Sequence, residues 1–162
     1  MSKVSRFIAV ALIATGLCSV AAAQGFDNRR LFFGAGLSQN QVSGADNGTG
    51  FQIFGGYNFP ELAPKFSVDA EAGFMDTGKM KVTGAPGDAE ADGLWASGVA
   101  RYMVAPSVEL LGRAGYDFGD DDGFLFGIGG GYIVNKNLKL RLEYVWRDNV
   151  DSLQFNVVFY PW

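Results

Sequence analysis

Charged side chains recur at every second position in several segments of this 162-residue chain, and that spacing decides which chemistry they can do. In segment 138–147, Lys139, Arg141 and Glu143 alternate with leucine and aromatic residues. Successive side chains of a β-strand point to opposite faces, so these charges share one face and the bulky residues share the other. Segments 66–74 and 108–118 repeat the pattern. Ion pairing on a common polar face is therefore the chemistry that we expect first.

Catalytic chemistry finds little support in the sequence. The chain has no histidine, so an acyl-transfer triad would need a substitute base. No spacing marks a carboxylate pair for general acid and base work. No nucleophile motif surrounds Ser38, Ser43, Ser97, Ser107 or Ser152. We expect a protein that is not an enzyme and has no catalytic residues.

Two further segments contain residue types that occur in ion-binding and phosphate-binding sites. The run Asp120-Asp-Asp122 offers oxygen ligands that suit calcium, but it lacks the ligand spacing and closing glutamate of an EF-hand. We interpret it as a solvated acidic loop, with cation binding left open. The glycine-rich segment 127–131 lacks the lysine and following helix of a phosphate loop. We expect neither a cofactor nor a metal site.

The elements that position the charges are eight strands separated by clusters of turn residues. We predict them at 30–42, 50–59, 66–75, 94–104, 108–118, 124–133, 138–146 and 152–160. Strands of about ten residues, each with an apolar and a polar face, are typical of a transmembrane barrel with lipid outside. The predicted fold is all-β, an eight-stranded antiparallel up-and-down transmembrane β-barrel. Phe51, Ile53, Tyr57 and Phe59 are expected to face outward on the second strand.

Eleven ionisable side chains share the expected inward face. The bases are Arg30, Arg101, Arg113, Lys139, Arg141 and Arg147, and the acids are Asp69, Glu71, Glu109, Asp117 and Glu143. Eight strands enclose only enough space for side chains, and an unpaired buried ion costs several kcal/mol. We therefore predict a network of paired charges that plugs the interior. The turn at Ala105-Pro106 is expected to place Arg101 directly opposite Glu109.

The N-terminus predicts export. Lys3 and Arg6 precede an apolar run, and Ala21-Ala-Ala23 supplies a small-residue cleavage motif, so residues 1–23 are interpreted as a signal peptide cleaved after Ala23. Cleavage removes two bases and no acid, which takes the net charge from −4 to −6, and it also removes Cys18, the only cysteine. Residues 24–162 form the barrel domain, whose stability owes nothing to disulfides.

The whole mature chain resembles the small eight-stranded outer-membrane barrels of Gram-negative bacteria, the OmpA-like, OmpX-like and opacity-type surface proteins. The resemblance rests on the signal peptide, the alternating strands, Tyr132 and Tyr144 near strand ends, and the closing segment 155–162. Val158, Tyr160 and Trp162 share one phase and resemble the terminal signal that the barrel-assembly machinery recognises. Leu153, Phe155, Val157 and Phe159 occupy the opposite phase, and a bulge beside Pro161 could join the two.

This resemblance implies a location in the cell outer membrane of a Gram-negative bacterium and contact with outer-membrane lipid. Our first hypothesis for function is a structural or surface-interaction role, with the loops at Ser43, 77–93 and 119–123 contacting an envelope or host surface ligand. A narrow channel for small solutes or ions is the alternative, and a lipid-modifying barrel enzyme is less favoured because such enzymes use a histidine. The acidic loops disfavour nucleic acid. We expect a monomer.

Overall fold

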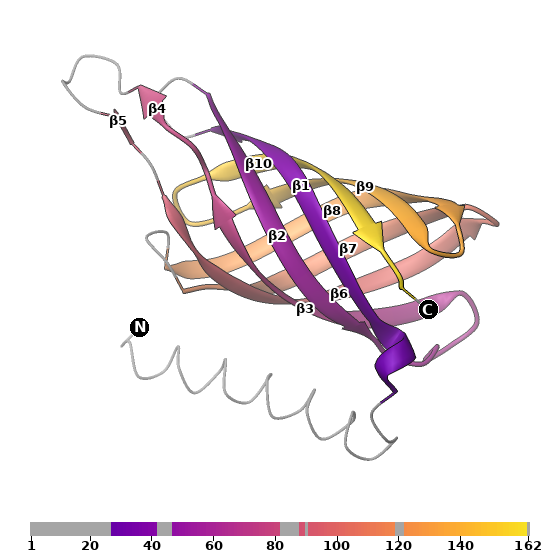
Figure 1. Cartoon of the computed structure of the whole chain (residues 1–162). Helices are drawn as coiled ribbons and strands as arrows, with labels where there is room; N and C mark the ends of the chain where they lie inside the picture. Colours follow the sequence, from indigo (N-terminus) through magenta and orange to yellow (C-terminus); the bar gives the residue numbers. More distant parts are fainter. Residues whose placement is uncertain (1–26, 42–46, 82–87, 90, 119–121, 162) are drawn as a thin grey trace.

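The computed structural model describes residues 27–41, 47–81, 88–89, 91–118 and 122–161, and it has one barrel (Figure 1). A single 3₁₀ turn, η1 (Asn28–Arg30), precedes the first strand. The eight barrel strands are β1 (Leu31–Gln41), β2 (Gly48–Asn58), β3 (Phe66–Asp76), β6 (Asp92–Ala105), β7 (Val108–Asp117), β8 (Gly123–Asn135), β9 (Leu138–Trp146) and β10 (Asp151–Phe159). Each lies within a few residues of its predicted range.

The barrel has the predicted up-and-down topology. Every strand pairs antiparallel with its neighbours in the order β1-β10-β9-β8-β7-β6-β3-β2, and β1 closes the sheet on β10. Closure leaves no free strand edge, so each barrel strand is hydrogen-bonded to a neighbouring strand on both sides. The predicted fold class is confirmed. Among the described residues there is no helix long and apolar enough to cross a membrane.

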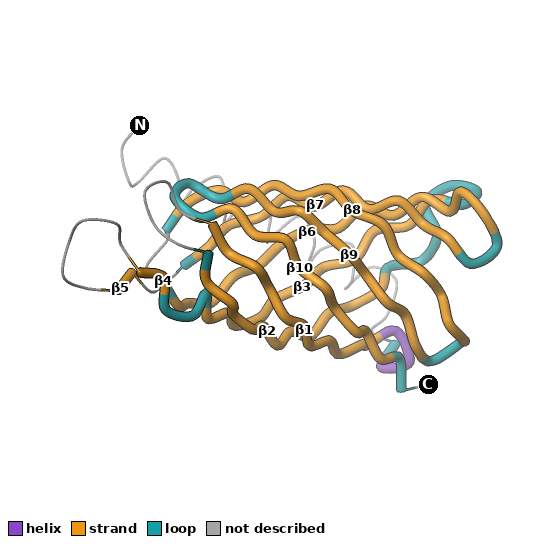
Figure 2. Tube along the Cα trace, turned by 90° about the horizontal axis from the view of Figure 1, so that it is seen from above, coloured by secondary structure: helices purple, strands orange, loops and turns teal. Residues whose placement is uncertain are grey.

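A small hairpin stands apart from the barrel and was not predicted. β4 (Met80–Lys81) pairs with β5 (Asp88–Ala89) in a separate two-stranded sheet. Both views show it at one end of the barrel, opposite η1 and the C-terminus (Figures 1 and 2). We call the end with the hairpin the loop end. The other end, which holds the short connections 59–65, 106–107 and 136–137, is called the turn end.

The side chains alternate between lumen and outer wall as predicted. On β10 every second side chain is buried, and the intervening ones, such as Phe155 and Val157, are exposed. Leu37, Leu94 and Ile128 are at least 60% exposed, which is expected of a surface that meets lipid. The prediction that Phe59 faces outward is wrong. It is only 6% exposed, and its ring lies 5.2 Å from that of Tyr57.

Inward glycines make room for aromatic rings in the lumen. A Cβ at Gly56 would collide with the Phe32 ring, and a Cβ at Gly34 would collide with the Phe54 ring. A barrel of eight strands has little interior volume, so a large side chain requires a small residue opposite. These glycines therefore allow the lumen to be filled by rings that come from neighbouring strands.

Candidate functional site: the charged lumen

The centre of the lumen holds a ring of four charges that comes from three strands. Glu71 on β3, Arg113 on β7, and Arg141 and Glu143 on β9 occupy inward positions. Arg113 contacts Glu71 (Nη2–Oε2, 2.8 Å) and Glu143 (Nε–Oε2, 2.9 Å). Arg141 contacts the same two acids (Nη1–Oε1, 2.6 Å, and Nε–Oε1, 3.3 Å). Each arginine thus joins both carboxylates, and the charges cancel within this central cluster.

A second group of four charges lies nearer the turn end. Arg101 contacts Asp69 (Nε–Oδ2, 2.7 Å) and Glu109 (Nη1–Oε2, 3.2 Å), while Lys139 contacts Glu109 (Nζ–Oε1, 2.8 Å). The side chains of both acids are fully buried. This turn-end cluster also contains two acids and two bases. It is therefore electrically neutral on its own, like the central cluster.

The strand register beside this cluster differs from the predicted one. A bulge between Met103 and Ala105 places Met103 opposite Glu109, while Arg101 lies opposite Leu111. The prediction that Arg101 lies directly opposite Glu109 is therefore wrong. Arginine is long enough to reach the acid diagonally across the strands, so the two side chains still make an ion pair.

The loop end of the lumen contains one more ion pair and a polar layer. Arg147 contacts Asp117 (Nε–Oδ2, 2.9 Å) and donates to the Ser152 hydroxyl (2.8 Å). The Ser152 hydroxyl donates in turn to Asn40 Oδ1 (2.6 Å), which anchors β10 to β1. These contacts continue the polar filling of the lumen to the base of the loops.

Uncharged amides complete the lumen, although only charged residues were predicted to fill it. Gln52 donates to Gln154 Oε1 (2.9 Å) and to Asn156 Oδ1 (2.6 Å), and all three side chains are buried. Asn156 Nδ2 lies 3.5 Å from Glu143 Oε1, at the edge of the central cluster. The inward phase of β2 and β10 would have identified these residues, because they alternate with Phe51, Ile53, Phe155 and Val157.

Aromatic rings pack against the cations in the same space. The Arg113 guanidinium carbon lies 4.9 Å from the centre of the Trp95 ring, and that of Arg141 lies 5.7 Å from the Phe54 ring. Cations are attracted to such ring faces. A buried apolar cluster surrounds the contacts and consists of Phe32, Phe54, Met75, Trp95, Leu125, Val145 and Val158. The lumen is therefore filled by both ion pairs and apolar side chains.

Ten of the eleven predicted inward charges lie in these groups, and Arg30 does not. It belongs to η1, and its Nε lies 3.8 Å from Asp27 Oδ2 near the protein surface. Asp27 also accepts a hydrogen bond from the backbone N–H of Arg29 (3.0 Å), which lowers the pKa of the Asp27 carboxyl. Counting back by twos from the inward residues of β1 places Arg30 on the inward face. The 3₁₀ turn, however, breaks this alternation before β1 begins.

Two residues of the expected terminal signal, Val158 and Tyr160, face the lumen rather than the outer wall. Val158 is fully buried, and the Tyr160 ring packs on Phe32 with 5.1 Å between ring centres. The outer wall of β10 is built from the opposite phase, namely Leu153, Phe155, Val157 and Phe159. Four features of the sequence analysis lie outside the described residues: Trp162, the loop at Ser43, most of Asp120–Asp122, and the segment 1–23 with its cleavage site at Ala23.

This arrangement suits a filled interior better than a reactive one. Each of the five lumen carboxylates has a basic nitrogen within 2.9 Å, so each is committed to at least one ion pair. In the described ranges no group of three or more Asp, Glu, His or Cys side chains could hold a metal ion. The geometry therefore supports ion pairing across the lumen as its main chemistry.

Known proteins place the barrel in a family. The outer membrane protein beta-barrel domain matches residues 10–158. The outer membrane protein Ail of Yersinia pestis in a phospholipid bilayer nanodisc has a TM-score of 0.57 and 14% identity, over 80% of this chain and 97% of that chain. A de novo designed transmembrane β-barrel has a TM-score of 0.53 and 21% identity, over 80% and 92%. No curated protein matches. Because the domain match spans nearly the whole chain, this protein belongs to the outer membrane protein beta-barrel domain family.

Proposed function

We propose that this outer-membrane barrel has a structural or surface-interaction role, exerted through its loop end, and that its interior is plugged by paired charges. One observation carries the plug. The side chains of the eight residues in the central and turn-end clusters are at most 10% exposed, and each contacts an opposite charge. Ions so well paired resist displacement, because separating them leaves a charge in a water-poor space. A non-enzymatic protein is the simplest interpretation.

The loop end supports contact with a ligand that is not strongly anionic. The exposed charged side chains described there are Asp92, Asp122, Asp148 and Lys79, so acids prevail. Ail, which shares the fold, has been crystallised in complex with the heparin analogue sucrose octasulfate. That ligand carries many negative charges, which the acidic end of this barrel would repel. We therefore infer an envelope or host surface partner of neutral or basic character.

Orientation in the membrane is part of the proposal and can be tested directly. With the signal peptide 1–23 removed after Ala23, the mature chain has no cysteine, so one introduced cysteine reports its own location. We expect Asp148→Cys at the loop end to react with a membrane-impermeant maleimide on intact cells. Lys65→Cys at the turn end is the matched control, and it should react only after the outer membrane is opened. The reverse pattern would contradict a loop end that faces the exterior.

The plug is tested by conductance. Purified protein in planar bilayers should show no sustained ionic current, because the paired side chains of the central and turn-end clusters block the lumen. A steady current would instead favour the second candidate function, a narrow channel for ions or small solutes. One observation favours that candidate: Ser152, Gln154 and Asn156 are buried polar residues at successive inward positions of β10, with Arg147 at one end and Glu143 at the other. A lipid-modifying enzyme ranks third and predicts altered envelope lipids on overexpression.

Biogenesis follows from the same proposal. Export by the signal peptide and recognition of the C-terminal strand by the barrel-assembly machinery would deliver the chain to the outer membrane as a monomer. The outward residues Phe155, Val157 and Phe159, rather than Val158 and Tyr160, present the apolar surface that is accessible on β10. Sequencing the N-terminus of the mature protein would test cleavage after Ala23.

A further inference from the structure

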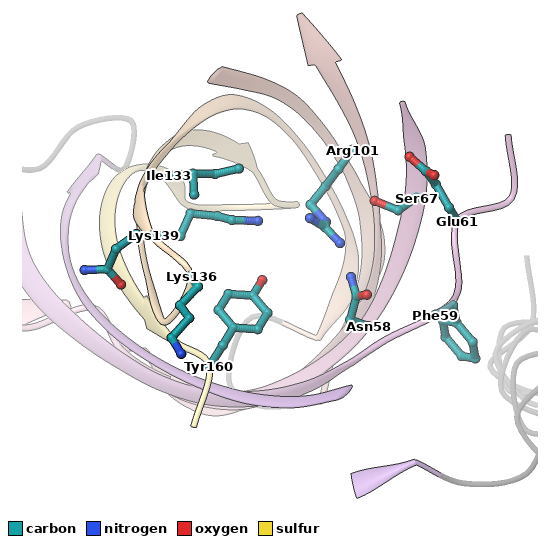
Figure 3. A pocket seen from close by; sticks show the side chains of 10 residues that line it. Asn58, Phe59, Glu61, Ser67, Arg101, Ile133, Lys136, Lys139 and Tyr160 are labelled. Atoms are coloured by element: carbon teal, nitrogen blue, oxygen red, sulfur yellow. The ribbon is translucent and has the colours of Figure 1, made fainter. Parts of the chain in front are cut away.

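A cavity whose lining residues are mostly polar lies at the turn end of the lumen, beside the turn-end cluster. It has a volume of about 380 Å³, within the range of small-ligand pockets, which begins at roughly 300 Å³. Asn58, Ser67, Arg101, Lys139 and Tyr160 contribute to its walls from the ends of different strands (Figure 3). A cavity built by side chains from so many strands is held in shape by the barrel itself.

Hydrogen-bond donors converge in this cavity. Figure 3 shows the Tyr160 hydroxyl pointing toward the space between the ends of Lys139 and Arg101. The hydroxyl oxygen is buried and has no hydrogen-bond partner among the described residues. Tyr160 is fixed in this pose, because its backbone N–H donates to the Asn137 carbonyl (2.8 Å) and its ring packs on Phe32. The hydroxyl is thus a positioned donor that lacks an acceptor.

The lining of the cavity carries excess positive charge. Arg101, Lys136 and Lys139 line it, and Glu61 is the only acid that does so. The two buried acids of the turn-end cluster, Asp69 and Glu109, are not part of the lining. Asp69 Oδ1 already accepts from Asn58 and Arg101, and Glu109 Oε2 already accepts from Arg101 and Lys139. A guanidinium has five N–H groups and an ammonium has three, so both cations keep spare donors. The cavity therefore offers donors and positive charge but few acceptors.

We propose that this cavity binds the phosphate group of a phosphate ester. Donors arrive around one space from β6, from β9 and from Tyr160 just after β10, which suits the several oxygens of a phosphate better than the two of a carboxylate. The Tyr160 hydroxyl donates to one oxygen, Arg101 and Lys139 contribute charge from the wall, and Lys136 attracts the anion at the rim. The ester is either a soluble metabolite or the headgroup of a phospholipid in the adjacent leaflet. This site shares Arg101 and Lys139 with the plug, and it lies at the end of the barrel opposite the loops.

The test uses the full mature barrel folded in zwitterionic detergent micelles and titrated with inorganic phosphate and with glycerol 3-phosphate. We expect saturable shifts in the backbone amide resonances of Asn137, Lys139 and Tyr160. Tyr160→Phe keeps the ring and removes only the hydroxyl, and it should weaken binding roughly tenfold, or about 1.4 kcal/mol. Lys136→Gln, on an exposed turn, should weaken it by a similar factor and does not disturb the barrel core.

Lys65→Gln is the matched control, because it removes one positive charge at the same end of the barrel from a residue that does not line the cavity. It should bind phosphate as the unmodified protein does. Non-saturating shifts would overturn the proposal, and so would equal losses in the Lys65 and Lys136 variants, since both indicate diffuse attraction by net charge. Binding that appears only in nanodiscs containing phosphatidic acid, and that inorganic phosphate competes away, would identify the headgroup as the source.

Discussion

Replacing Glu71 with glutamine should destabilise the barrel strongly, because Glu71 neutralises two arginines at once. Its Oε2 contacts Arg113 at 2.8 Å, and its Oε1 accepts from both Nη atoms of Arg141 at 2.6 and 2.8 Å. The carboxylate is fully buried, and an arginine cannot shed its proton to relieve a stranded charge. Breaking a buried ion pair from one side costs about 3 to 5 kcal/mol. We expect Glu71→Gln to fall in this range.

The measurement is equilibrium unfolding in urea of protein refolded into lipid vesicles, with the free energy of unfolding obtained by linear extrapolation. Glu61→Gln is the control, because it makes the same chemical change at an exposed turn residue. Surface substitutions of this kind usually stay within about 0.5 kcal/mol. The contrast between the two variants therefore separates the effect of burial from that of the substitution itself.

The double variant Glu71→Gln with Arg141→Gln gives the decisive comparison. It removes one acid and one base and leaves Arg113 paired with Glu143, so the remaining charges cancel. Its cost should be lower than the sum of the single costs by about 2 kcal/mol, which lies within the coupling range for residues in one network. Additive costs would refute the ion pair. A loss below about 1 kcal/mol for Glu71→Gln alone would mean that water screens the cluster, and the plug would be wrong.

Three further predictions probe the wall, the lumen packing and the closed barrel. Ile128→Arg places a charge on the outer wall, at a side chain that is 60% exposed. If that wall faces the bilayer midplane, the substitution should cost about 2 to 4 kcal/mol of folding stability. A negligible cost would argue against lipid contact. Gly56→Ala should cost about 1 to 3 kcal/mol because its Cβ would meet the Phe32 ring, while Gly112→Ala, whose Cβ meets nothing within 4 Å, should be nearly neutral in the same urea assay. Boiled and unboiled samples of membrane-extracted protein should migrate differently on a denaturing gel, because a closed barrel resists detergent until heated, and identical migration would count against closure.

Strand positions could be predicted from the sequence because alternation of period two is a strong signal when one face meets lipid and the other is polar. Segment 138–146 was predicted as a strand with these same limits, and β9 has them. The hairpin of β4 and β5 could not be predicted in this way. Each of its strands has only two residues, which is too short to show any alternation.

Local backbone geometry explains the residues that were placed wrongly. Arg30 sits in a 3₁₀ turn, where counting by twos from β1 no longer applies. Phe59 lies just beyond β2, where the chain turns, and its ring packs against Tyr57 instead of facing outward. In each case the residue lies beyond a strand end, where the pleat no longer dictates the direction of the side chain.

The alternation of apolar and polar residues does not determine the register between neighbouring strands. The ion pairs of the lumen can determine it. A slip of two residues keeps every side chain on its own face, so the apolar outer wall tolerates it. The same slip of β9 would move Arg141 away from Glu71, which is 70 positions earlier in the sequence and on a strand that is not adjacent to β9. Buried charges penalise such a mismatch far more than lipid-facing leucines do. The alternating apolar residues therefore select the barrel and its two faces, while the charges that cross the lumen select one register among those the faces allow.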